Sequence, residues 1–263
     1  MVEHMADYGN NFVQLHNHTH YSLLDGASKV PDLVKRVKEL GMPAVGITDH
    51  GNMHGAYELW RAAVDSGVKP IIGIEAYVTP ETARQDKTRV SWDTNWTPVP
   101  GHARNPDDVS GGGLITHLTM WAENDEGLVN LIKASSVANL EGRVMRYPRM
   151  DKEVLSTYSK GVIASSGCPS GIIQTRLRLG QFDEALRAAG EFQDIFGKDN
   201  FYIELMDHGL SIESKVTGDL LTIAKKLGAP LLATNDSHYV MEADKDAQDA
   251  MLCINSGATL DDP

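Results

Sequence analysis

Basic residues are scarce in this sequence of 263 residues, where 24 Lys and Arg face 36 Asp and Glu and the formal net charge is −12. Proteins that grip a nucleic-acid duplex by neutralising its phosphates are usually basic, so strong duplex binding by this chain alone is excluded. Cysteine is scarcer still: Cys168 and Cys253 form no disulfide framework and favour a reduced, cytoplasmic setting. No apolar run approaches the ~20 residues of a membrane span, which excludes an embedded protein and membrane partners.

What remains is an ordinary globular composition, with 41% hydrophobic and 23% charged residues. We expect an N-terminal tail at 1–11, with an expression scar at 1–4, and exclude it from the fold. One domain at 12–263 is expected to follow. Its last residues, 259–263, read as a truncation, so any downstream domains would be absent.

Seven short apolar runs predict strands, and most are continuous rather than alternating, as in parallel strands covered on both faces. They lie at residues 12–15, 44–48, 70–78, 114–121, 161–164, 201–205 and 230–233. Helical periodicity at 30–40 and 219–227 ends at Gly41 and Gly228. Alternation of strand and helix over this length predicts a single α/β domain, with a TIM-like barrel as the natural architecture and an open doubly wound sheet as the alternative.

Two segments depart from this alternation. Residues 85–113, with three prolines and a run of three glycines, predict a long surface insertion. The densest basic stretch is formed by Arg143, Arg146, Arg149 and Lys152. It is interpreted either as a solvated connector or as a phosphate-facing patch.

Metal-binding residue types stand at the ends of the predicted strands. They are His16, His18, His50, Glu75, His117, Cys168, His208, Asp236 and His238. Alternate residues of a strand point to the same face, so the two side chains of a His-x-His or Asp-x-His pair can bind the same ion. Mixed nitrogen and oxygen ligands suit zinc, manganese or iron, and the number of ligands predicts two or three divalent ions. Asp49 and Asn235 flank ligands and are expected to orient them, whereas His208 is interpreted either as a substrate contact or as structural.

Seven motifs carry a family resemblance. They are LHNHTHYSLLDGA from Leu15, GITDHGNMHGA from Gly46, KPIIGIEAYV from Lys69, HLTMWAENDEGLVNL from His117, ASSGCPSG from Ala164, FYIELMDHG from Phe201 and LLATNDSHY from Leu231. Over about residues 12–263 the sequence resembles the PHP (polymerase and histidinol phosphatase) domain of the bacterial replicative DNA polymerase III alpha subunit. The resemblance implies a distorted TIM-like (β/α)7 barrel.

The resemblance also implies a ligand set for up to three ions. Its nine positions are His16, His18, Asp25, His50, Glu75, His117, Cys168, Asp236 and His238. In the family pattern the first ion is held by His16, His18, Glu75 and Asp236, the second by Glu75, His117 and Cys168, and the third by Asp25, His50 and His238. Catalysis would rest on the bridging Glu75 and on Asp25, Asp236 and His238, which hold the ions and place the attacking water.

The implied activity is metal-dependent 3′→5′ exonuclease proofreading in DNA replication. The expected substrate is a single-stranded DNA 3′ terminus, which this domain binds weakly. Polymerase domains of the same chain, downstream of this segment, and other replisome subunits are the expected partners. Two alternatives remain: a metal-stabilised scaffold without turnover that braces the polymerase or docks an exonuclease subunit, and a small-molecule phosphatase of the histidinol-phosphate type.

Overall fold

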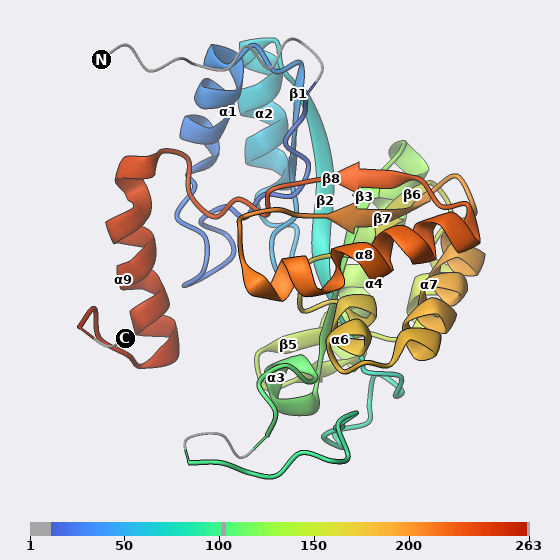
Figure 1. The fold of residues 1–263 in the computed structure, drawn as a ribbon. Coiled ribbons are helices and arrows are strands. Elements are labelled where there is room, and N and C mark those ends of the chain that lie inside the picture. Colours follow the sequence, from blue (N-terminus) through green and yellow to red (C-terminus); the bar gives the residue numbers. More distant parts are fainter. Residues whose placement is uncertain (1–11, 101–103, 262–263) are drawn as a thin grey trace. The chain divides into compact units, whose positions relative to one another are not determined.

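The computed structural model describes residues 12–100 and 104–261, whose contacts divide into two compact units. The first unit comprises the described residues within 1–49, 54–72 and 237–263, and the second those within 50–53 and 73–236. The predicted tail at 1–11, with its expression scar, lies outside the described residues. Each unit joins segments that are far apart in the sequence, as the colours of Figure 1 show.

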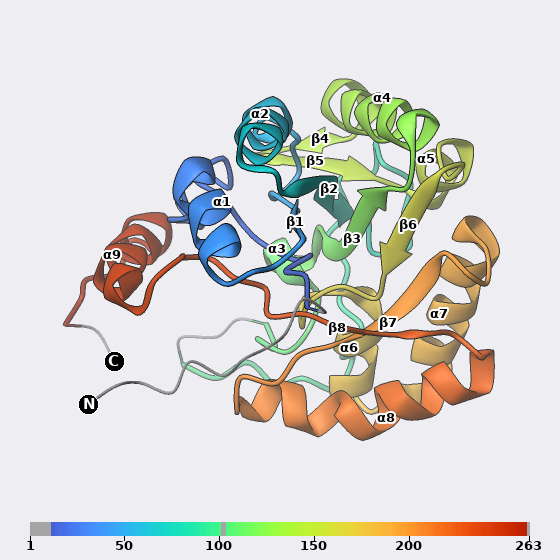
Figure 2. The same ribbon diagram turned by 90° about the horizontal axis from the view of Figure 1, so that it is seen from above.

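The first unit is a small helical layer on a short parallel strand pair. Its elements are α1 (Val30–Glu39), β1 (Ala44–Ile47), α2 (Ala56–Ser66), the first part of β2 (Lys69–Val78), the 3-10 helix η2 (Glu242–Asp244) and α9 (Lys245–Ser256). Helices α1 and α2 pack against each other and against β1 (Figure 2). The predicted helix at 30–40 is confirmed, because Leu33, Val34 and Val37 face the core and Pro31 stands in the first turn, where no backbone N–H donor is needed.

The predicted strand at 12–15 is reduced to isolated pairings. Gln14 forms a parallel bridge with Val45, and three residues later Asn17 forms one with Ser237. Because the segment pairs with different parts of the chain at positions only three residues apart, no continuous ladder forms. It nevertheless runs parallel to β1, as the predicted fold requires.

The second unit is a mixed sheet covered by helices. Its elements are α3 (Ser110–Gly113), β3 (Thr116–Ala122), α4 (Asp125–Glu141), β4 (Arg143–Val144), β5 (Tyr147–Met150), α5 (Lys152–Thr157), β6 (Val162–Ser165), α6 (Ile172–Arg178), α7 (Phe182–Phe196), β7 (Phe201–Leu205), α8 (Ser211–Leu227) and β8 (Leu231–Ala233). The strands follow the order β4-β5-β2-β3-β6-β7-β8. Helices α7 and α8 pack on β7 (Figure 2). The predicted α/β class is confirmed, although α8 begins eight residues before the predicted 219.

The prediction that the strands are parallel is wrong for β3, which runs antiparallel to both β2 and β6. Val78 at the end of β2 lies opposite Thr116 at the start of β3. A parallel strand needs a crossover that returns the chain to the edge where it began. Here the insertion brings the chain back to the edge of the sheet at which β2 ends, so β3 runs in the opposite direction to β2.

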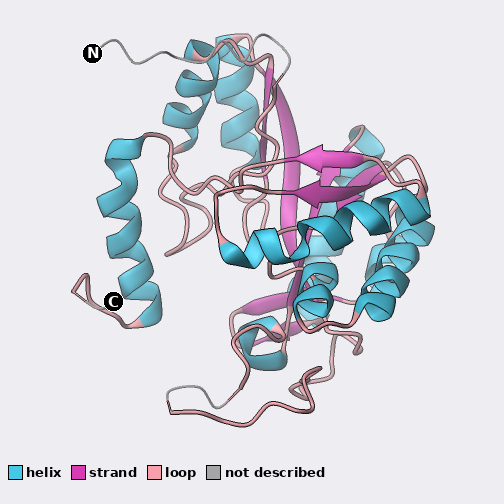
Figure 3. Ribbon diagram, viewed as in Figure 1, coloured by secondary structure: helices cyan, strands magenta, loops and turns pink. Residues whose placement is uncertain are grey.

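The insertion is joined to the second unit by specific contacts. Its described residues, 85–100 and 104–113, contain one short helix, α3, and otherwise loop (Figure 3). The buried carboxylate of Asp108 accepts hydrogen bonds from the Ser91 hydroxyl and the Trp92 backbone N–H. The guanidinium of Arg176 stacks 3.7 Å from the Trp92 ring centroid. The described part of this loop is therefore folded onto α6.

The basic stretch at 143–152 is exposed at Arg143 and Arg146 but not at Arg149. It forms the hairpin of β4 and β5, which the sequence analysis missed, and Arg149 within it is fully buried. The Arg149 guanidinium donates to the backbone carbonyls of Arg84, Asp86, Leu114 and Gly142. Lys152 is paired with Glu191. Both interpretations, an exposed connector and a phosphate-facing patch, are wrong for Arg149, whereas Lys152 is partly exposed and they stay open for it.

Replacing Arg149 with methionine is expected to lower the free energy of unfolding by about 2–3 kcal/mol, because buried carbonyls lose their donors while a costly buried charge is also removed. Urea unfolding monitored by circular dichroism measures the change. Arg146→Met is the matched control, since Arg146 is exposed on the same hairpin. Equal midpoints for the two variants would contradict the structural role of Arg149.

None of the helices in the described part of the chain has the length and apolar character needed to cross a bilayer.

Candidate metal centre

The segment that carries His16 and His18 is fixed by backbone and amide hydrogen bonds within the first unit. The Asn17 side-chain amide donates to the carbonyls of Gln14 and Gly46, at 3.1 and 2.9 Å. The His18 N–H donates to the Ser237 carbonyl at 2.8 Å. The two histidines, on either side of Asn17, are therefore held in a rigid backbone, and both are fully buried.

Four predicted ligands belong to the first unit, and the structure brings them together. His16 and His18 have their Nε2 atoms 3.4 Å apart. The rings of His18 and His238 stack at 4.4 Å, and His238 Nε2 lies 3.1 Å from Asp25 Oδ2. Ligand atoms of His18, Asp25 and His238 lie within 4.8 Å of one another, close enough to hold one ion. The Gln248 side chain of α9 donates to the Asp25 carbonyl and so ties this aspartate to the helix.

Asp49 fixes the turn between His18 and Asp25. Its Oδ1 accepts from the Thr19 N–H at 2.7 Å and from the Ser22 hydroxyl at 2.8 Å. The Thr19 hydroxyl donates to Oδ2 at 2.9 Å. These contacts support the expected orienting role, because the residues that Asp49 holds lie next to candidate ligands.

Replacing Asp49 with alanine is expected to destabilise the protein by about 1–3 kcal/mol, because buried donors on Thr19 and Ser22 lose their acceptor. Differential scanning calorimetry measures the effect. Asp65→Ala is the control, since the Asp65 side chain on α2 is 60% exposed and pairs only with Arg61 among the described contacts. A melting temperature unchanged from that control would refute the orienting role.

The other five predicted ligands belong to the second unit, where four of them surround one buried carboxylate. Glu75 of β2 is fully buried, and its Oε1 lies 2.7 Å from His117 Nδ1 and 3.0 Å from Cys168 Sγ. Its Oε2 lies 3.6 Å from His50 Nδ1. Ligand atoms of His50, Glu75 and His117 lie within 4.8 Å of one another, and Asp236 reaches within the same distance of Glu75.

The loop that carries Cys168 is held by α6. The buried Gln174 amide donates to the Gly167 carbonyl at 2.6 Å, and the Arg178 guanidinium donates to the Pro169 carbonyl. The thiol therefore has a fixed position, 3.3 Å from His117 Nδ1. Burial raises the pKa of the Cys168 thiol well above its usual value, and the charge of Glu75 raises it further.

These residues fit a divalent cation. A buried carboxylate and a thiol that resists ionisation are stabilised when a positive charge lies between them. Imidazole, carboxylate and thiolate together suit zinc, manganese or iron better than calcium or magnesium. His50, Glu75, His117 and Cys168 would hold such an ion in the second unit, and His18, Asp25 and His238 one in the first.

Two buried acids of this region were not singled out from the sequence. Glu204 of β7 accepts from the hydroxyls of Ser165 and Thr234. Glu213 of α8 binds His208. A charge inside the apolar run at 201–205 is the signal that could have identified Glu204, whereas nothing in the sequence marks Glu213 apart from other acids in the first turn of a helix.

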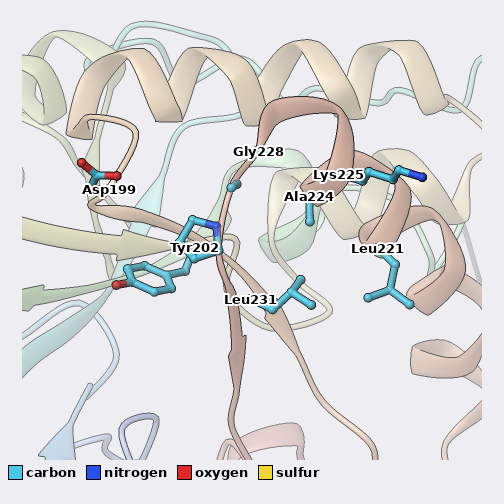
Figure 4. A pocket seen from close by; sticks show the side chains of 9 residues that line it. Asp199, Tyr202, Leu221, Ala224, Lys225, Gly228 and Leu231 are labelled. Carbon is cyan, nitrogen blue, oxygen red and sulfur yellow. The ribbon is translucent and has the colours of Figure 1, made fainter.

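A pocket of about 670 Å³ between β7, β8 and α8 is separate from these ligands (Figure 4). It is lined by Asp199, Tyr202, Leu221, Ala224, Lys225, Gly228, Ala229, Pro230 and Leu231. It lies where β7 and β8 begin, whereas Asp236 follows the end of β8. None of the nine candidate ligands lines it, so its volume does not mark the metal centre.

Comparison with known proteins supports the resemblance seen in the motifs. The sequence matches the PHP domain family over residues 14–208. DNA polymerase III subunit alpha of Mycobacterium tuberculosis is 51% identical over 255 residues, which cover 97% of this chain and 21% of that protein. The same subunit of Saccharopolyspora erythraea is 53% identical over 251 residues, with coverages of 95% and 21%. The chain thus spans about one fifth of the length of these relatives.

Among solved structures, an amidohydrolase from Chromobacterium violaceum aligns with a TM-score of 0.49 and 14% identity, covering 92% of this chain and 97% of that one. The family match is the informative one, because it takes in seven of the nine candidate ligands and most of the chain. On this ground the chain belongs to the PHP domain family.

Proposed function

We propose that this chain is the PHP domain of a bacterial replicative DNA polymerase alpha subunit and that it is a metal-dependent 3′→5′ exonuclease. The domain would extend over residues 12–263, beyond the matched 14–208. The observation that carries the proposal is the complete ligand set. All nine positions hold a side chain that can bind a metal, and the short distances between candidate ligand atoms within each unit support their role as ligands. A chain that had lost the activity would be free to lose such costly buried groups.

Each residue has a chemical role in this proposal. Glu75 would act as the central ligand of the second unit, since both of its oxygens already face other ligands. Asp236 would complete the ligand set of the second unit. Asp25 and His238 would hold an ion in the first unit. Zinc, manganese or iron ions bound there would supply Lewis-acid activation of a phosphate ester and stabilisation of the leaving oxygen.

The charge of the chain supports a frayed DNA 3′ terminus as the substrate. With a net charge of −12 the domain lacks the basic surface that duplex binding needs. A single-stranded end would bind weakly and reach the metal ions only when mispairing frees it. The duplex would be held by polymerase domains of the same protein, in the cytoplasm and with other replisome subunits.

An assay on three substrates tests this proposal. Purified protein with Mn²⁺ or Zn²⁺ is offered a 3′-labelled single strand, a 5′-labelled single strand read for shortening, and a phosphomonoester. We expect mononucleotides to leave the 3′ end, while the phosphomonoester stays intact. Hydrolysis of the phosphomonoester alone would favour the histidinol-phosphate type of phosphatase. No hydrolysis with metal bound would favour the non-catalytic scaffold.

A further inference from the structure

His208, which is partly exposed, and the buried Glu213 form a hydrogen-bonded pair between β7 and α8. Glu213 lies in the first turn of α8, and its side chain is only 7% exposed. One of its carboxylate oxygens lies 2.5 Å from His208 Nδ1, and the other accepts the His208 backbone N–H at 2.8 Å. Two contacts to one carboxylate fix both the backbone and the ring of His208.

The other ring nitrogen of His208 holds a second segment of the chain. His208 Nε2 lies 2.8 Å from the backbone carbonyl oxygen of Asn235. A carboxylate and a carbonyl accept hydrogen bonds, so this geometry favours an imidazole in which both ring nitrogens donate. The hydrogen bond with Glu213 accordingly raises the pKa of His208 above its usual value. With both nitrogens engaged by the chain, the geometry favours the structural interpretation of His208 over the substrate contact.

Asn235 directly precedes the candidate ligand Asp236, whose backbone is unusual. Asp236 has a φ of 45°, in the left-handed region that costs a residue other than glycine about 1–2 kcal/mol. Strand β8 has already ended at Ala233, and the Thr234 N–H makes a 3.2 Å bond to the Leu205 carbonyl. The contact of His208 with the Asn235 carbonyl is thus the next hydrogen bond along the chain after Thr234, and it lies immediately before the strained Asp236.

We propose that the Glu213–His208 pair is a positioning device that holds the Asn235 carbonyl and thereby keeps Asp236 in its left-handed, metal-binding conformation. Among the described contacts the pair makes no hydrogen bond to a candidate ligand side chain, and it is linked to Asp236 through the Asn235 carbonyl and through charge. The proposal rests on the proposed function only in taking Asp236 as a metal ligand, and it requires no particular substrate.

The test uses Mn²⁺ alone as the probe. His208→Ala removes the contact to Asn235, and Glu213→Gln keeps the volume of the side chain while removing its charge. We expect each variant to weaken Mn²⁺ binding about 10-fold or more, as loss of a partner behind a metal ligand typically does. The double variant should be no weaker than His208→Ala, because the two residues act as one unit. Glu126→Gln, an exposed acid in the first turn of α4, is the matched control.

A second readout separates positioning from general stability. Hydrogen exchange of the chelated protein should speed up at 234–238 in His208→Ala and Glu213→Gln, with core strands such as β7 unchanged. Parent-like Mn²⁺ affinity and exchange in both variants would overturn the proposal. Weakened affinity in a protein whose parent excises no nucleotide would support the positioning device and contradict the exonuclease. A parent that binds no Mn²⁺ would overturn both.

Discussion

Asp236→Asn is expected to reduce 3′→5′ excision of a mismatched terminus by at least about a hundredfold, and Asp25→Asn to do the same. Asparagine keeps the shape and one oxygen of each side chain but removes a charge that helps to hold a cation. Metal ions contribute several kcal/mol to phosphoester hydrolysis, and about 1.4 kcal/mol corresponds to tenfold in rate. Single-turnover excision of a 3′-labelled primer measures the loss.

Each variant has a control in its own unit. Asp32→Asn changes an exposed acid of α1, and Asp199→Asn changes the acid beside the pocket of Figure 4. Both controls should excise at the parent rate. In a full-length polymerase, nucleotide addition should persist in the Asp25 and Asp236 variants while the error frequency rises. If the folded Asp25 and Asp236 variants excise at the parent rate, the exonuclease proposal is wrong and the non-catalytic scaffold is the remaining hypothesis.

Removal of metal is expected to lower the melting temperature by roughly 10 °C. An ion that binds only the folded state adds about 4 kcal/mol at a thousand times its dissociation constant, and 1 kcal/mol shifts a domain of this size by about 2–4 °C. Without these ions, buried Glu75 lies beside the Cys168 thiol, whose pKa is raised by burial and further by the charge of Glu75. Calorimetry before and after chelation, with metal content verified, measures the shift.

Restoring Mn²⁺ or Zn²⁺ should restore the melting temperature, whereas Ca²⁺ should do so far less, since imidazole and thiolate are poor ligands for it. Cys168→Ser is a useful comparison, because it keeps a small polar side chain but removes the sulfur that zinc favours. An identical melting curve with and without bound metal would refute the stabilising role and leave catalysis untouched.

Strands and ligands were predictable where one local pattern decides them. The run at 201–205 is β7 with the predicted bounds, because a continuous apolar segment between polar turns has few alternatives. His16 and His18 could be paired from spacing alone, and they lie together as expected. Asp25 was different: it follows a turn rather than a strand, and only the family resemblance identified it.

Features that depend on distant residues were not predictable. The reversal of β3 follows from where the insertion returns the chain, which no periodicity records. In the sequence Arg149 has the pattern of a surface charge, but in the folded chain it donates to four carbonyls from three separate segments. Glu213 and His208 are five positions apart in the sequence, but the proposed positioning role depends on their contact with Asn235. Only folding places Asn235 beside His208.

Metal titration of the chelated protein, read as excision of a 3′-labelled single strand, tests the central claim most directly. The account predicts no excision without metal, a rise with added Mn²⁺ or Zn²⁺ that saturates at two or three equivalents per chain, and no rise in Asp236→Asn. Full metal occupancy without release of 3′ nucleotides would contradict it.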